Sequence, residues 1–68
     1  MKTFCDRVKE LRLEHHFTQK ELAEKLNTSN SSVCDWEKGR SQPDLQTLAN
    51  MAQLFGVSTD YLLGLSDD

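Results

Sequence analysis

The stretch from residue 18 to residue 40, which reads TQKELAEKLNTSNSSVCDWEKGR, contains two short helical patterns separated by a few turn-forming residues. In the first pattern Leu22, Ala23 and Leu26 fall on one helix face, and the small Ala23 lets another helix approach closely. In the second pattern Val33 and Trp36 share a face, and small polar residues occupy the opposite side. We therefore expect two short packed helices, the second of which keeps a polar face free.

Capping residues set the limits of both helices. Thr18 and Glu21 match the capping box, in which each side chain bonds the free backbone amide of the other residue, so the first helix begins at Thr18. Ser29 is an N-cap for a helix over 30–38, and Gly39 suits the left-handed position that ends it. Two helices joined in this way predict a helix-turn-helix, whose second helix can enter a groove of DNA.

The flanking segments predict three further helices and no strand. These helices span about 2–15, 45–55 and 59–63, and the last two follow capping residues. Leu13 lies away from the apolar stripe of its helix, either as an isolated exposed leucine or as part of a partner surface. The expected core stripes of the two longer helices are Phe4, Val8, Leu11 and His15, and Leu45, Leu48, Met51, Ala52 and Phe55.

The length of the chain, 68 residues, allows one all-α domain over 1–68, with an ordered core over about 2–65 and a frayed tail. The sequence has no apolar run near the ~20 residues of a membrane span, and no signal-like segment follows its start, so we expect a cytoplasmic protein. Cys5 and Cys34 lack the spacing of a disulfide framework or a metal site and are interpreted as reduced thiols. The chain is compatible with a complete small protein or with the N-terminal domain of a longer regulator.

The net charge is −3, but the charges are unevenly distributed. All eight lysines and arginines lie in residues 1–40 with seven carboxylates, whereas residues 41–68 carry four carboxylates and no base. Because local charge steers a protein toward phosphate more than the total does, this distribution permits DNA binding. The acidic total predicts weak non-specific binding that falls quickly as salt rises.

The run from Thr18 to Pro43 resembles the phage-repressor-like helix-turn-helix family (Cro/cI-type, also called the xenobiotic-response-element family). The residues that carry the resemblance are Thr-Gln-Lys-Glu-Leu-Ala from Thr18, then Ser29, Val33, Trp36-Glu37-Lys38-Gly39 and Pro43. The similarity extends over about 4–64 and implies a compact five-helix, lambda-repressor-like DNA-binding domain. The chain departs from the family pattern at His16, where glycine or a small polar residue is common, and at Cys34 and Asp35 in the recognition helix.

Candidate base-reading residues lie on the outer face of the helix over 30–38. In a recognition helix docked on DNA, the N-terminal residues reach the base edges. In this chain those residues are Asn30 and Ser31, and Asp35 lies one turn beyond Ser31. Asn30 can pair with adenine through two hydrogen bonds, and Asp35 can only accept, so that cytosine is its natural partner. Ser31, Ser32 and Ser41 fit solvated surface serines equally well. Cys34 flanks this face as a small passive side chain or, alternatively, as a redox switch.

Candidate phosphate contacts surround these residues. The free backbone amides at the start of the helix after Thr18, with the Gln19 side chain, can bind a phosphate. The resemblance adds contacts near the ends of the recognition helix. The full set is Thr18, Gln19, Ser29, Ser32, Lys38, Arg40 and Ser41.

Glu37 lies beside Val33 and Trp36, where its carboxylate would be buried, and a buried charge needs a partner. In the resembling family an arginine of the first helix supplies that partner, and the corresponding residue here is Arg12. We therefore expect an Arg12 to Glu37 ion pair that orients the recognition helix.

These features predict a sequence-specific DNA-binding transcriptional regulator, most simply a repressor that binds an inverted-repeat operator as a homodimer. The last helix and its flanks, with Val57, Tyr61, Leu63 and Leu65, form the expected dimer surface. The alternative is a protein-interaction module, such as an antitoxin or an anti-repressor subunit, which the acidic second half and Leu13 favour. No catalytic, metal-binding, cofactor-binding or small-molecule site is expected, because no nucleophile-base arrangement, ligand cluster or phosphate loop is present in the sequence.

Overall fold

The computed structural model describes residues 2–67, and within that range the protein consists of five helices and no strand. The all-α prediction is therefore confirmed for these residues, while residues 1 and 68 of the expected 1–68 domain lie outside the description. The helices are α1 (Phe4–Glu14), α2 (Gln19–Lys25), α3 (Asn30–Lys38), α4 (Leu45–Phe55) and α5 (Thr59–Leu62).

Side-chain caps fix the starts of the helices. The hydroxyl oxygens of Thr18, Ser29 and Ser58 accept hydrogen bonds from backbone amides of the first turns of α2, α3 and α5, and the Asp44 carboxylate does so for α4. The expected start of α1 at residue 2 is wrong, because a capping box between Thr3 and Asp6 begins that helix at Phe4. These bonds satisfy amides that have no partner inside the helix.

The turn between α1 and α2 requires a left-handed residue, and His16 occupies it with φ 59°. The His16 amide donates to Leu13 O at 3.0 Å and the Phe17 amide donates to Arg12 O at 3.0 Å, which closes the end of α1. A side chain with a Cβ is strained in this conformation. The departure of His16 from the family pattern therefore coincides with a strained backbone position.

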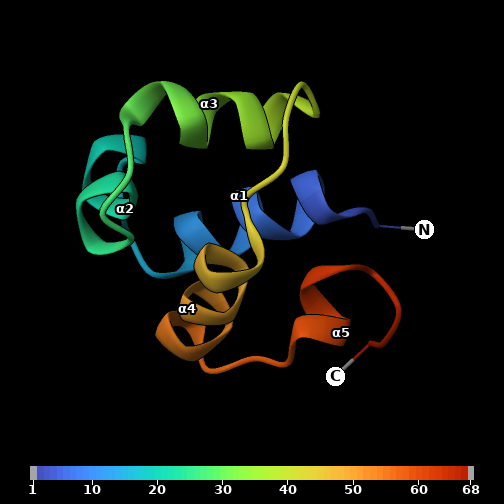
Figure 1. Cartoon of the computed structure of the whole chain (residues 1–68). Coiled ribbons are helices and arrows are strands. Elements are labelled where there is room, and N and C mark those ends of the chain that lie inside the picture. The colour runs from blue at the N-terminus through green and yellow to red at the C-terminus, as the bar shows by residue number, and fades with distance from the viewer. Residues whose placement is uncertain (1, 68) are drawn as a thin grey trace.

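The helices are arranged on both sides of α1. Figure 1 shows α3 on one side of α1 and α4 and α5 on the other; α3 packs on α1 and α2, and α5 packs on α1 and α4. The buried apolar residues form one cluster, so α2 and α3 share a single core with the C-terminal helices. Its members are Val8, Leu11, Leu22, Ala23, Leu26, Val33, Trp36, Met51, Ala52, Phe55 and Leu62.

Two residues expected in the core stripes are exposed. Leu45, the first residue of α4, is 84% exposed. His15 is also exposed, although its ring centre lies 5.0 Å from that of Phe55 and its Nδ1 lies 2.9 Å from Leu11 O. The helical period predicted the face of the helix on which each residue lies. It did not predict how much of that face the rest of the protein covers.

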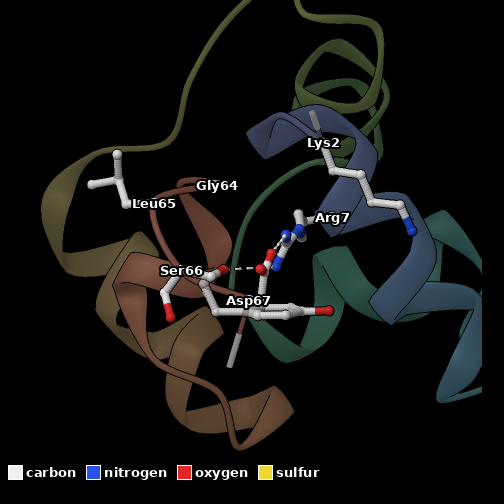
Figure 2. Close-up of a pocket in the computed structure, with 7 residues that line it drawn as sticks. Lys2, Arg7, Gly64, Leu65, Ser66 and Asp67 are labelled. Carbon is white, nitrogen blue, oxygen red and sulfur yellow. Dashed lines mark hydrogen bonds and ion pairs between the residues drawn. The ribbon is translucent and has the colours of Figure 1, made fainter.

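Arg7 is buried although it is charged, and sequence analysis did not single it out. Its guanidinium carbon lies 3.9 Å from the ring centre of Tyr61, its Nη1 donates to Ser66 O at 3.1 Å, and its Nη2 lies 3.6 Å from Asp67 Oδ1 (Figure 2). The signal was its position four residues before Leu11, on the buried side of α1. Arg7 therefore ties the segment after α5 to α1.

Candidate nucleic-acid interface

The outer face of α3 presents the predicted base-reading residues to solvent. Asn30 and Ser31 are exposed in the first turn, and the Asp35 side chain is 42% exposed one turn farther along. Val33 and Trp36 are buried on the opposite face of the helix. The helix α3 packs against α1 and α2 (Figure 1). The buried face of α3 is thus fixed to the rest of the domain, while the polar residues on its outer face stay accessible to solvent.

Two exposed cations, Lys38 and Arg40, lie at the C-terminal end of α3. Gly39 ends the helix in the left-handed conformation, with φ 74°, and the Arg40 amide donates to Asp35 O at 2.9 Å. This bond folds Arg40 back over the last turn, where its Nη1 lies 4.0 Å from Asp35 Oδ1. Lys38, Arg40 and Ser41, three of the predicted phosphate contacts, are exposed here.

The two serines at the start of α3 bond to each other. Ser29 Oγ accepts from the Ser32 amide at 3.1 Å, and the two hydroxyl oxygens lie 2.9 Å apart. Only one of the two hydroxyl protons is used in that contact, so the other is available to a phosphate oxygen. Ser29 is exposed and Ser32 is half-buried.

The start of α2 carries a reciprocal capping box. The Glu21 amide donates to Thr18 Oγ1 at 3.0 Å, and the Thr18 amide donates to Glu21 Oε1 at 2.9 Å. Hydrogen bonds from Thr18, first from its backbone amide and then from its side chain, hold the pKa of Glu21 below its usual value. The box shapes the helix N-terminus that we expect to meet a phosphate.

The expected ion pair of Arg12 and Glu37 is present and joins α1 to α3. Arg12 Nε lies 2.6 Å from Glu37 Oε2 and Nη2 lies 3.1 Å from Oε1, while Nη1 donates to Phe17 O at 2.9 Å. The two side chains are 12% and 5% exposed, so the pair is largely removed from water. A pair with two parallel bonds fixes direction as well as distance.

Gln19, which the sequence suggests as a phosphate contact, also joins this network. Its Nε2 donates to Glu37 Oε1 at 3.3 Å, and the residue is half-buried. The first residue of α2 lies against the end of α3 because the motif folds the two helices together. One side of the Gln19 amide is therefore committed to Glu37, and its oxygen and remaining proton are left for other contacts.

The expected dimer residues separate into two pairs. Val57 and Tyr61 are half-buried and pack on the core, whereas Leu63 and Leu65 are 46% and 75% exposed. Leu45, which the sequence placed in the core, lies with Leu63 along an apolar groove of about 230 Å³. The other residues that line this groove are Phe4, Gln42, Pro43 and Leu48.

Residues 2–67 show no candidate metal site, membrane-spanning helix or disulfide. No group of three or more histidine, cysteine or acidic residues in that range is placed to hold a metal ion. None of the described helices has the length and apolar character needed to cross a membrane. Cys5 and Cys34 are both free and half-buried.

Known proteins resemble this chain in sequence and in fold. The model of a family described as "Helix-turn-helix" matches residues 8–62. The chain is 42% identical over 65 residues to an uncharacterized HTH-type transcriptional regulator, YobD, of Bacillus subtilis (strain 168). The aligned residues cover 96% of this chain and 58% of YobD. The chain is 48% identical over 58 residues to the HTH-type transcriptional regulator ImmR of the same organism, covering 85% of this chain and 46% of that one.

Among solved structures, the P22 c2 repressor in complex with a synthetic operator superimposes with a TM-score of 0.90 at 23% identity, covering 97% of this chain and 100% of the other. That likeness concerns the fold. The chain spans only about half the length of the two Bacillus relatives.

Proposed function

The chain belongs to the helix-turn-helix family whose model it matches, and on that premise we propose that it is a sequence-specific regulator of transcription that binds double-stranded DNA through α3. The observation that carries the proposal is the division of α3 into two faces. Val33, Trp36 and Glu37 fix one face to the rest of the domain, and Asn30, Ser31 and Asp35 lie clear of it on the other. The two Bacillus relatives are HTH-type transcriptional regulators by name.

In this proposal Asn30, Ser31 and Asp35 read base edges in the major groove. Asn30 and Ser31 occupy the first turn of α3, the part of a recognition helix that reaches deepest. Asn30 suits adenine and Asp35 suits the amino group of cytosine. Each good pairing contributes about 1–3 kcal/mol of discrimination.

The proposed phosphate contacts lie on both sides of the base-reading residues. Thr18 and Gln19 act at the start of α2, where backbone amides are free, and Ser29 and Ser32 act at the start of α3. Lys38, Arg40 and Ser41 act at the other end of α3. Such contacts position the domain on the duplex and contribute affinity that depends on salt.

One domain of this size makes few base contacts, so we propose a homodimer that reads two half-sites of an inverted repeat about 34 Å apart. Leu63 and Leu65 supply exposed apolar surface for its interface, and Leu45 adds to it. Occupation of an operator by such a dimer represses transcription by blocking the polymerase. The protein acts in the cytoplasm as a DNA-binding protein and not as an enzyme.

Selection from random duplexes tests the proposal. We expect an enriched inverted repeat, with an affinity that falls steeply between 50 and 200 mM salt. The Asn30→Ala variant should lose the preference at the base that Asn30 reads and should stay folded, because the removed side chain is exposed. A pool that shows no enriched sequence after several rounds would rule out specific reading.

A protein-interaction module is the second candidate, since Leu13 on α1 is 54% exposed and residues 41–68 carry no base. That function predicts a stoichiometric protein partner on purification. It also predicts unchanged activity after Asn30→Ala and Asp35→Ala.

A further inference from the structure

Asp35 and Arg40 lie together on the exposed side of α3. Arg40 Nη1 is 4.0 Å from Asp35 Oδ1, and the side chains are 68% and 42% exposed. The Arg40 amide donates to Asp35 O at 2.9 Å, so the backbone itself holds Arg40 over the turn that carries Asp35. The proximity of the two side chains is thus built into the C-terminal cap of the recognition helix.

The charge of Asp35 makes this proximity important. A carboxylate that approaches DNA alone is repelled by the phosphates, and it can only accept a hydrogen bond. The Arg40 guanidinium, 4.0 Å from the carboxylate, offsets that repulsion and would enter the groove together with Asp35. Lys38 is exposed at the same end of α3 but forms no ion pair within residues 2–67.

A donor beside an acceptor matches one kind of base pair. In the major groove a G·C pair presents the N7 and O6 acceptors of guanine and the N4 amino donor of cytosine. Guanine O6 and cytosine N4 are neighbours, because they bond to each other within the pair. Arginine donates through two hydrogen bonds to guanine, and aspartate accepts from cytosine N4.

We propose that Asp35 and Arg40 act as one unit that reads a G·C base pair, with the guanidinium on guanine and the carboxylate on cytosine. Arg40 is then a specificity-determining residue rather than the phosphate contact expected from the sequence. This inference rests on the proposed DNA-binding function.

The test compares binding preferences of the full chain and of the variants Asp35→Ala, Arg40→Ala and the double variant. In the wild-type site, replacing the G·C pair should weaken binding by roughly 5- to 150-fold. Each single variant should lose that preference at the same position, and the double variant should lose no more than either one. Circular dichroism checks that the variants remain folded.

Lys38→Ala is the matched control, because it also removes one cation from the end of α3. It should weaken binding to all sequences alike and reduce the dependence of log K on log salt by about one unit. If Arg40→Ala behaves like Lys38→Ala, with the G·C preference intact, Arg40 contacts phosphate and the inference is wrong. If the wild-type chain enriches no sequence, the proposed function fails and this inference fails with it.

Discussion

The guanidinium of Arg12 on α1 bonds both carboxylate oxygens of Glu37 on α3, at 2.6 and 3.1 Å. Glu37 is one residue after the buried Trp36 and two after Asp35, whose side chain is 42% exposed. A rotation of α3 about its axis that moved Asp35 would therefore break this pair. The direction in which the outer face of α3 points thus depends on a contact on the buried side of the helix.

Replacing Arg12 by methionine should destabilise the protein by about 3–5 kcal/mol, because Glu37 is left buried without its cation. Chemical denaturation measures the loss, and DNA affinity should fall with it. The double variant Arg12→Met with Glu37→Leu should recover most of the stability, since removing both charges of a buried pair is often neutral. An unchanged unfolding midpoint in the single variant would contradict a structural role for the pair.

Replacing His16 by glycine should stabilise the protein by about 0.5–1 kcal/mol. His16 has φ 59°, a conformation that costs a residue with a Cβ more than it costs glycine. The gain corresponds to a rise in melting temperature of roughly 2–8 °C for a domain of this size. Asn27→Gly is the control, because Asn27 has φ 56° but asparagine tolerates this region well, so its gain should be smaller.

Stability should fall in acid through the carboxylates that cap helices. Hydrogen bonds from the backbone amides of Thr3, Thr18 and Thr47 lower the pKa of Asp6, Glu21 and Asp44. Each carboxylate then binds a proton more readily in the unfolded chain, so its contribution is complete above the unfolded pKa of about 4 and is lost as pH falls through the lower folded value.

Urea unfolding between about pH 6 and pH 2 measures this loss. A variant with Asp6→Asn, Glu21→Gln and Asp44→Asn should be less stable near neutral pH and should show a flatter acid slope. A slope equal to that of the wild type would assign the acid sensitivity to other groups.

Charge placed on the exposed leucines should dissociate the proposed homodimer. Leu45→Asp and Leu65→Asp alter side chains that are 84% and 75% exposed, so the fold of each subunit should be retained. Sedimentation should show a shift toward monomer, and affinity for an inverted repeat should fall more than affinity for one half-site. Leu13→Asp, at an exposed leucine of α1 outside the groove, should leave the association state unchanged.

Local signals explain why so much of the fold was predictable. The capping residues Thr18, Ser29 and Asp44 act within one turn, so the starts of α2, α3 and α4 follow from sequence alone. The burial of Leu45 was predicted wrongly because coverage depends on the reach of other helices.

The side-chain partners of the candidate site were harder to predict. The bond from Gln19 to Glu37 and the approach of Arg40 to Asp35 depend on how α2 and the α3 cap are packed, which no spacing rule encodes. The burial of Arg7 had a periodic signal, but an arginine at such a position is normally expected to reach solvent.

Arg7 and Arg12 stand on the same helix and hold opposite parts of the chain, Ser66 after α5 and Glu37 in α3. They are five positions apart on the helix, which is about 7.5 Å along the axis. Detaching α3 takes the Glu37 carboxylate from Arg12, which then keeps only Phe17 O as an acceptor, and detaching the C-terminal segment takes Ser66 O from Arg7. Neither part therefore opens on its own without a cost in free energy. The domain should therefore melt in a single cooperative step.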